Sequence, residues 1–249
     1  MIQTVFNRYE KKYLMPESVY LRLRERLIPY MKPNEFGAST ICNIYYDTPS
    51  NELIRRSIEK PVYKEKLRLR SYGIPALTDT VFLEIKKKYM RVVNKRRIPL
   101  RLSDAYAYVE QGVRPSANGQ ILREIDFFLQ RYDLRRAIYL AYDRIALEGR
   151  QDASFRVTFD SRIRCRRTAV ALEAGDAGRM LLPEGFYLME SKIQGAAPVW
   201  FTDILTDLAV YPVSFSKYGT AYKQETADWH VEKLLCHWND NWKERKAVC

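Results

Sequence analysis

KEKLRLR, residues 64–70, carries a Lys or Arg at every second position, with Glu or Leu between them. Successive side chains of a β-strand point to opposite faces, so this stretch predicts a strand with one cationic face and one mostly apolar face. A solvated strand face usually mixes both signs, because like charges on neighbouring strands repel. The same alternation occurs in residues 81–88 and 155–165, through Glu84, Lys86 and Lys88 and through Arg156, Thr158, Asp160, Arg162 and Arg164. Several cationic strand faces therefore indicate a surface that holds a polyanion.

The composition is that of a globular protein with an anionic partner. The chain has 249 residues, of which 47% are hydrophobic, so one large domain or two small ones can form a core. Its formal net charge of +12 indicates nucleic acid, an anionic membrane or a phosphorylated metabolite as the partner. The four cysteines form no CxxC pair, the first 13 residues do not resemble a signal peptide, and no apolar run could span a bilayer. We expect a soluble, cytoplasmic protein with reduced thiols.

Eight strands are expected along the chain, with helices between some of them. The strands are predicted at residues 2–13, 41–47, 62–71, 81–88, 91–101, 138–147, 155–165 and 186–194, with a short extended stretch at 213–218. Apolar spacing predicts helices from Pro16 to near Pro33, from Ser103 as N-cap to Gln111 before Gly112, and over residues 118–132 and 198–209. Residues 166–183 are expected to be irregular. We expect one domain over residues 1–225 and a helical tail over residues 226–249.

The charged faces raise the question of whether the sheet is open or closed. About eight strands can close into a barrel whose interior holds side chains or one ligand. In that case the charged faces would point inward and the apolar faces outward, under the helices. Crowded cations inside a barrel cost stability unless carboxylates, water or an anionic ligand offset them.

The remaining strands add charges to the same pattern, and their order along the chain is informative. The residues are Arg8, Glu10 and Lys12; Arg91, Lys95, Arg97 and Arg101; Arg144; Glu190 and Lys192; and Lys217. With these motifs the sequence resembles the VTC domain family, the polyphosphate polymerase branch of the CYTH-like triphosphate tunnel metalloenzymes. The matching stretches, within residues 6–222, are RYEKKY (8–13), IYYDT (44–48), KLRLR (66–70), LEIK (83–86), KRR (95–97), YDR (142–144), MESK (189–192) and FSKY (215–218).

The resemblance implies an α+β fold with an eight-stranded antiparallel closed barrel, a tunnel that binds nucleoside triphosphate and polyphosphate with Mn²⁺ or Mg²⁺. By matched position, Glu190 would be the metal ligand. The first strand departs from the wider superfamily's Glu-x-Glu-x-Lys pattern, because Arg8 fills the first Glu position. The catalytic phosphate contacts would be Lys12, Arg68, Arg70, Lys86, Lys95, Arg144, Arg156 and Lys217, and further phosphate or nucleotide contacts would be Glu10, Lys66, Arg97 and Lys192.

The sequence favours transfer of the ATP γ-phosphate to a growing polyphosphate chain, with release of ADP. A phosphate oxygen is then the nucleophile and needs no general base, which suits a site with few His and Asp residues. Three alternatives remain open at this point. They are a hydrolase in which Glu10 or Glu84 orients water, a non-catalytic module that binds polyphosphate or inositol phosphate, and a nucleic-acid binder. The oligomeric state and any membrane-associated partner are left undetermined by the sequence.

Overall fold

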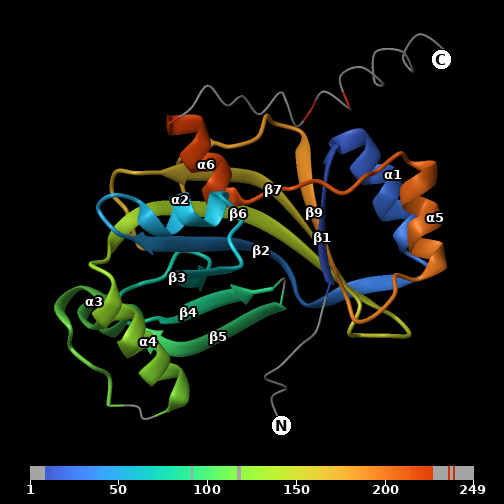
Figure 1. Ribbon diagram of the computed structural model, residues 1–249. Helices are drawn as coiled ribbons and strands as arrows, with labels where there is room; N and C mark the ends of the chain where they lie inside the picture. Colours follow the sequence, from blue (N-terminus) through green and yellow to red (C-terminus); the bar gives the residue numbers. More distant parts are fainter. Residues whose placement is uncertain (1–8, 91, 117–118, 227–234, 236–237, 239–249) are drawn as a thin grey trace. The chain divides into compact units, whose positions relative to one another are not determined.

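The computed structural model describes residues 9–90, 92–116, 119–226, 235 and 238 and consists of a large sheet with helices (Figure 1). The strands are β1 (Tyr9–Pro16), β2 (Met31–Asp47), β3 (Tyr63–Tyr72), β4 (Thr80–Tyr89), β5 (Val92–Arg101), β6 (Arg135–Gly149), β7 (Arg156–Arg166), β8 (Arg179–Met180) and β9 (Phe186–Ile193). The helices are α1 (Glu17–Leu27), α2 (Glu52–Ile58), α3 (Leu102–Gln111), α4 (Gln120–Arg131), α5 (Val199–Asp207) and α6 (Lys217–Thr226). None of these helices is long and apolar enough to cross a lipid bilayer.

Hydrogen bonds link the strands in the order β1-β9-β7-β6-β2-β3-β4-β5, and β8 pairs with β7. The pairs β1–β9, β7–β9, β2–β3, β3–β4 and β4–β5 are all antiparallel. The expected α+β fold with a large antiparallel sheet is therefore confirmed. Within the described strands no hydrogen-bonded ladder joins β1 to β5, so the closed barrel stays a prediction.

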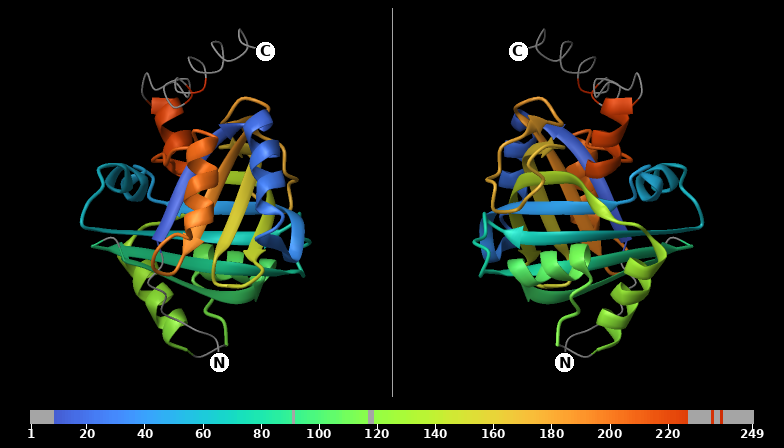
Figure 2. Two further views of the ribbon diagram at one scale, coloured as in Figure 1. Left: turned by 90° about the vertical axis from the view of Figure 1, so that its right-hand side faces the viewer. Right: turned by 90° about the vertical axis from the view of Figure 1, so that its left-hand side faces the viewer.

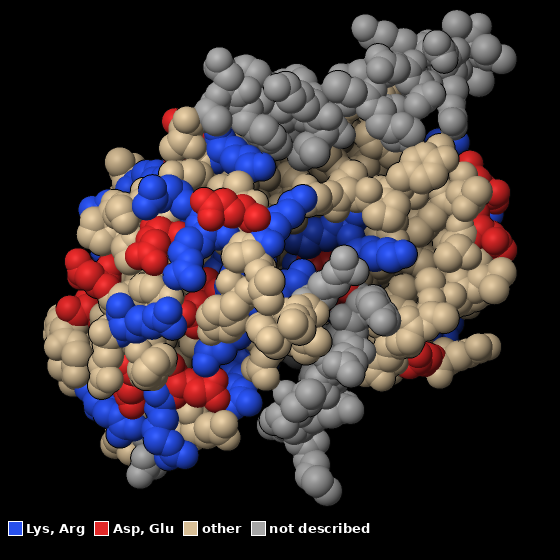
Figure 3. Space-filling model, viewed as in Figure 1, with Lys and Arg blue, Asp and Glu red and all other residues tan. Residues whose placement is uncertain are grey.

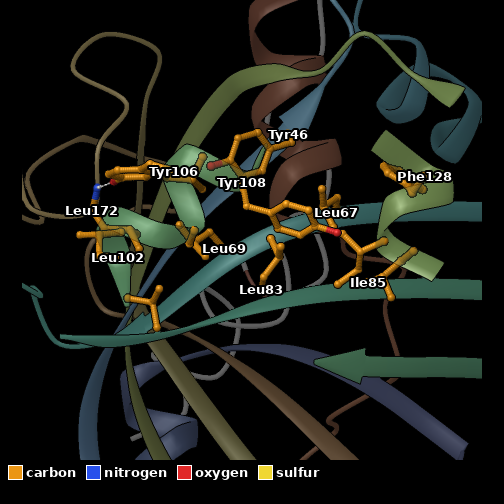
Figure 4. Packing of buried hydrophobic residues seen from close by; sticks show 14 of the residues in the cluster. Tyr46, Leu67, Leu69, Leu83, Ile85, Leu102, Tyr106, Tyr108, Phe128 and Leu172 are labelled. Carbon is orange, nitrogen blue, oxygen red and sulfur yellow. Dashed lines mark hydrogen bonds between the residues drawn. The ribbon is translucent and has the colours of Figure 1, made fainter. Parts of the chain in front are cut away.

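The chain divides into two compact units, of which the first contains Thr40–Ala141 and Arg164–Arg179. Here the alternation predicted from the sequence decides which strand face is covered. Leu67 and Leu69 of β3 and Leu83 and Ile85 of β4 are fully buried in a core that α3 and α4 share. Figure 4 shows these side chains packed with Tyr46, Tyr108 and Phe128, and the hydroxyl of Tyr106 accepting a hydrogen bond from the Leu172 amide.

The second unit contains the described parts of Arg8–Ser39, Tyr142–Ile163 and Met180–Cys249. Figure 2 shows α1 and α5 over one face of β1, β7 and β9. Tyr20 and Leu23 of α1 and Phe201 of α5 are buried there against Phe159 of β7 and other apolar strand residues. Trp238 is also buried in this core and donates a hydrogen bond to the Leu14 carbonyl oxygen at 2.7 Å. Most of the predicted 226–249 tail lies outside the described residues.

Several element boundaries differ from the sequence prediction. The extended stretch expected at 213–218 was wrong, because Lys217 begins helix α6. The first helix ends at Leu27 rather than near Pro33, since β2 already begins at Met31. Arg101, and not Ser103, is the N-cap of α3, whereas Gly112 ends that helix in the left-handed conformation as predicted, with φ of 73°.

Helix α2 was not predicted, and a buried carboxylate explains why it forms. Asp47, at the end of β2, accepts hydrogen bonds from the backbone amides of Thr48, Leu53 and Ile54 at 2.8–3.0 Å. The bonds from Leu53 and Ile54 satisfy amides that a helix leaves unpaired in its first turn, and a carboxylate is favourable at that end of the helix. A single carboxylate therefore joins the end of β2 to the start of α2.

Candidate functional site

In the first unit, a cluster of cations surrounds the buried carboxylate of Glu84. The Glu84 side chain is fully buried on β4, on the face opposite Leu83 and Ile85. Its Oε2 lies 2.5 Å from Arg68 Nε and 3.9 Å from Arg70 Nε. Its Oε1 lies 2.7 Å from Lys95 Nζ. One carboxylate thus has three cationic partners from β3 and β5.

Neighbouring polar side chains orient the two arginines of this cluster. Arg68 donates to the Tyr45 hydroxyl at 3.1 Å, and Arg70 donates to Asn43 Oδ1 at 2.9 Å. Asn43 in turn donates to the Leu140 carbonyl oxygen at 3.0 Å. Register explains these contacts, because β2 places Tyr45 opposite Arg68 and Asn43 opposite Arg70. The guanidinium groups are therefore held in fixed directions before any ligand binds.

Within this cluster the pKa values of Glu84 and of Lys95 are both lowered. Burial raises the pKa of Glu84, but Arg68, Arg70 and Lys95 outweigh burial and hold the pKa below its ordinary value. Burial and then the charge of Arg68 lower the pKa of Lys95 to about 7, against the opposing effect of Glu84. The lysine is thus disfavoured as a cation although a carboxylate lies beside it. The cluster contains more positive charge than its acid neutralises.

In the second unit, Asp160 of β7 has a similar role. Its side chain is fully buried and accepts two hydrogen bonds from Arg144, at 2.6 and 2.8 Å. Lys217 Nζ donates to Asp160 Oδ2 at 2.5 Å and lies 4.2 Å from the centre of the Tyr142 ring. Burial raises the pKa of Asp160, but Arg144 and Lys217 outweigh burial and lower it to about 2. Asp160 is therefore ionised at neutral pH and shared by two cations.

Glu190 of β9 lies among lysines on the same unit. Lys192 Nζ is 3.0 Å from Glu190 Oε1, and Lys12 Nζ is 3.9 Å from Oε2. Lys12 also donates to the Phe215 carbonyl oxygen at 2.9 Å. Burial raises the pKa of Glu190, but Lys192, Lys12 and two further cations hold it well below its usual range. The carboxylate is ionised, and 13% of its side chain is exposed to solvent.

Within each unit, the predicted site residues gather unevenly. Arg68, Arg70 and Lys95 surround Glu84; Lys66 and Lys86 face each other across β3 and β4. Lys12 and Lys192 contact Glu190, while Arg144 and Lys217 contact Asp160.

Three other predicted residues are exposed. Arg97 is exposed and packs over the Phe82 ring, 4.4 Å from its centre. Arg156 is exposed and donates to the Ala153 carbonyl oxygen at 3.4 Å, and Glu10 is exposed at the start of β1. Arg162 has a φ of 46° and pairs with Asp143 at 3.3 Å, so the regular alternation of β7 breaks there. Arg8 and Arg91 lie outside the described residues.

Sequence reasoning missed the positioning role of Asp160 and of the polar residues around the arginines. Asp160 was recognised on the charged face, and the alternation was the signal that could have found it. Asn43 and Tyr45 lie on the same face of β2, two residues apart, but only the register with β3 places them beside Arg70 and Arg68. Tyr142, two residues before Arg144, could have been found by the same alternation.

The helix-covered side of the first unit has a different charge pattern. There Lys87 and Arg96 share Glu124 at 3.1 and 2.5 Å, and Arg136 pairs with Glu110 at 2.6 Å. Figure 3 shows blue and red side chains interspersed around α3 and α4, as on an ordinary solvated surface. The excess of cations is therefore a property of the strand face with Glu84 rather than of the whole unit.

A metal could bind here only with help from a ligand. Among the described residues there is no group of three or more His, Cys, Asp or Glu side chains able to hold an ion. Mg²⁺ in phosphate sites is commonly held by one or two carboxylates together with phosphate oxygens and water. The carboxylate of Glu190, which is partly exposed, fits such a site and does not fit a cage built from protein ligands alone.

Comparison with known protein families identifies the family of this chain. A model of the VTC domain matches residues 7–226. The chain belongs to the VTC domain family. The resemblance predicted from the motifs is thereby confirmed. No curated protein matches the sequence.

Solved structures support the fold of this VTC protein. A putative adenylate cyclase from Bacillus halodurans has a TM-score of 0.54 at 16% identity, covering 85% of this chain and 96% of its own. A putative adenylyl cyclase from Hippeastrum, described as revealing a dominant triphosphatase activity, has a TM-score of 0.54 at 13% identity. The alignment covers 90% of this chain and 98% of the Hippeastrum protein. At these identities the likeness shows the fold alone.

Replacing Glu84 with Gln tests whether the carboxylate holds the first cluster together. We expect Glu84→Gln to lower the free energy of unfolding by about 3 kcal/mol, because buried cations lose their shared partner. Chemical denaturation measures the change, with the exposed Glu59→Gln as the control. Tripolyphosphate should stabilise Glu84→Gln more than it stabilises the wild-type protein. Equal stability of Glu84→Gln and wild type would contradict the assigned role.

The depressed pKa of Lys95 predicts a pH dependence of stability. Between about pH 7 and the ordinary lysine pKa of about 10.4, the unfolded chain binds a proton that the folded chain has lost, so this group makes stability rise with pH. Below about pH 7 both states are protonated and the contribution is constant. We expect the unfolding free energy of wild type minus that of Lys95→Met to increase from pH 7 to pH 9. A difference that falls or stays flat across this interval would show that the pKa is not lowered.

Proposed function

We propose that this VTC protein is a metal-dependent polyphosphate polymerase that transfers the γ-phosphate of ATP to the end of an inorganic polyphosphate chain and releases ADP. One observation supports the proposal: each of the three carboxylates Glu84, Asp160 and Glu190 has two or three cationic partners. The acids fix the cations in place but do not neutralise them. The remaining positive charge suits a ligand with a negative charge on every repeating group.

The arginines supply the geometry that phosphate requires. A guanidinium group offers parallel N–H donors that match two phosphate oxygens, whereas a lysine acts as a point charge. Arg68 and Arg70 are already oriented by Glu84, Tyr45 and Asn43, so little reorganisation is needed when phosphate binds. Arg144 is oriented by its two hydrogen bonds to Asp160. We assign these three arginines to phosphate binding and charge stabilisation.

Phosphoryl transfer requires few further groups from the protein. A terminal oxygen of the polyphosphate chain attacks the γ-phosphorus, the new P–O bond forms, and the bond to the β-phosphate oxygen breaks. Most of the barrier reduction in such transfers comes from positioning and charge neutralisation. Lys217 and Lys12 add positive charge without needing to exchange protons in the reaction, and Lys95 adds charge when it is protonated. The attacking phosphate oxygen is already ionised, and therefore no general base is required.

Glu190 is the residue that would hold a divalent cation. Its carboxylate would supply one oxygen ligand and phosphate oxygens the others, which agrees with its partial exposure. When bound, the cation supplies additional neutralisation of phosphate charge. Lys12 and Lys192 keep Glu190 ionised and in position.

Hydrolysis in the same site is less well supported. A hydrolase needs a group that orients or deprotonates water, and Glu84 was the internal candidate. Glu84 is fully engaged by Arg68 and Lys95, and its pKa is lowered, so it is a poor proton acceptor. The other candidate, Glu10, is exposed at the start of β1.

The proposal is tested by incubating the protein with ATP and Mn²⁺ or Mg²⁺ and separating the products on a gel. Long polyphosphate with a matching amount of ADP supports the polymerase. Free phosphate without polymer would establish the hydrolase instead. Binding of tripolyphosphate without any turnover would establish a non-catalytic module.

Glu190→Gln separates metal use from phosphate binding. We expect polymer formation to fall by orders of magnitude, because the carboxylate that holds the cation is lost. Metal-free binding of tripolyphosphate, measured by calorimetry, should not weaken, since the cations remain. The increase in tripolyphosphate affinity that Mn²⁺ produces should disappear in Glu190→Gln and persist in the exposed control Glu184→Gln. Retention of the Mn²⁺ effect in Glu190→Gln would remove Glu190 from the metal site.

A further inference from the structure

Beyond the Glu84 cluster, the same face of β3 and β4 continues as a row of opposed lysines. The register places Lys64 directly opposite Lys88 and Lys66 directly opposite Lys86, and Lys86 is also opposite Lys95 of β5. Side chains in directly opposed positions have Cβ atoms roughly 5 Å apart, and like charges there are destabilising. This arrangement costs stability and is not expected on an ordinary solvated strand.

Nearby acids on the same strands do not compensate the pair Lys64–Lys88. Glu65 points to the other face, where it accepts hydrogen bonds from the hydroxyls of Tyr63 and Tyr132 at 2.6 and 2.9 Å. Glu84 lies four residues from Lys88 and is held by Arg68 and Lys95.

The electrostatics of Lys64 agree with this placement. Its ammonium group donates to the Ser57 carbonyl oxygen at 3.0 Å, which is a neutral partner. Burial and then the charges of Lys88, Lys60 and Lys86 lower the pKa of Lys64. Both Lys64 and Lys88 are partly exposed, so an anion can reach them.

We propose that Lys64 and Lys88 form an additional subsite that binds phosphates of a linear polyphosphate chain beyond the three phosphates of a triphosphate. This inference rests on the proposed function, because it extends the cluster around Glu84. From Arg70 to Lys64 the strand advances six residues, or about 20 Å. A triphosphate held by Arg68 and Arg70 is much shorter than that distance. Only a longer chain could contact the arginines and Lys64–Lys88 together.

The subsite would therefore make affinity depend on chain length. A triphosphate bound at the arginines would leave Lys64 and Lys88 unoccupied. A long polyphosphate would relieve the repulsion between the two lysines and gain charge-assisted hydrogen bonds. The pair would retain the growing chain near the site between successive transfers.

The test compares tripolyphosphate with long-chain polyphosphate by calorimetry in one buffer, on the full-length protein. The test variant carries both Lys64→Gln and Lys88→Gln. The control variant carries both Lys11→Gln and Arg22→Gln, which removes the same amount of charge from exposed positions on β1 and α1. In the Lys64/Lys88 variant we expect the dissociation constant for long-chain polyphosphate to rise by about tenfold or more. The dissociation constant for tripolyphosphate should change by less than about twofold. The control should leave both constants near those of the wild type.

Each other outcome would overturn the subsite. An equal loss in the control would show a general charge effect, and an equal loss for tripolyphosphate would place the lysines in the main cluster. No change would show that Lys64 and Lys88 are only solvated. Duplex DNA of equal charge that binds as tightly, with the same loss in the variant, would show a non-selective polyanion face.

The subsite and the polymerase can fail separately. Binding is measured without turnover, so chain-length selectivity in a protein that makes no polymer would sustain the subsite and defeat the polymerase. If the wild type makes polymer and the Lys64/Lys88 variant binds long chains as tightly as the wild type does, the polymerase is supported and the subsite is overturned. Thermal unfolding of each variant confirms that the substitutions leave the protein folded.

Discussion

The carboxylate shared by several cations is the interaction on which both units depend. Burying a charge costs free energy unless the charge is paired with an opposite one. A buried acid that contacts two or three cations gives each of these cations a partner and is itself paired. Glu84 does this for Arg68, Arg70 and Lys95, and Asp160 does it for Arg144 and Lys217. Each acid fixes the directions of its cations while leaving a net positive charge. This residual charge is the basis of the proposed phosphate binding.

One face of the strands packs in the core, and the opposite face carries the charged residues. On β3 and β4 the apolar residues pack under α3 and α4, and their burial supplies the stability that crowded lysines and arginines reduce. In the second unit α1 and α5 cover the corresponding apolar residues. Because strand side chains alternate, the covered face and the charged face come from alternate residues of the same strands. The sequence pattern that forms the core therefore also forms the charged face.

Much of the fold could be predicted from alternation alone. Most strand positions followed from the sequence because each depends on neighbouring residues, but β2 begins at Met31 rather than at residue 41, and β8 was not expected. The partners of each charge did not follow, since they depend on register between strands: Asn43 meets Arg70, and Lys64 meets Lys88, only through pairing across β2, β3 and β4. Lys217 was placed on a strand because the short segment around it has little periodicity, and it is in fact the first residue of α6. The lysine pairs are the clearest gain from the structure, because a single strand shows charge but not which charges are opposed.

The most direct test is a crystal structure with tripolyphosphate and Mn²⁺ bound. In the first unit we expect phosphate oxygens within hydrogen-bonding distance of the guanidinium groups of Arg68 and Arg70, with both still paired to Glu84. In the second unit we expect the same of Arg144, still paired to Asp160, and anomalous density for Mn²⁺ beside Glu190. Phosphate bound elsewhere, with these arginines contacting only their carboxylates, would contradict the central claim that their excess charge binds phosphate.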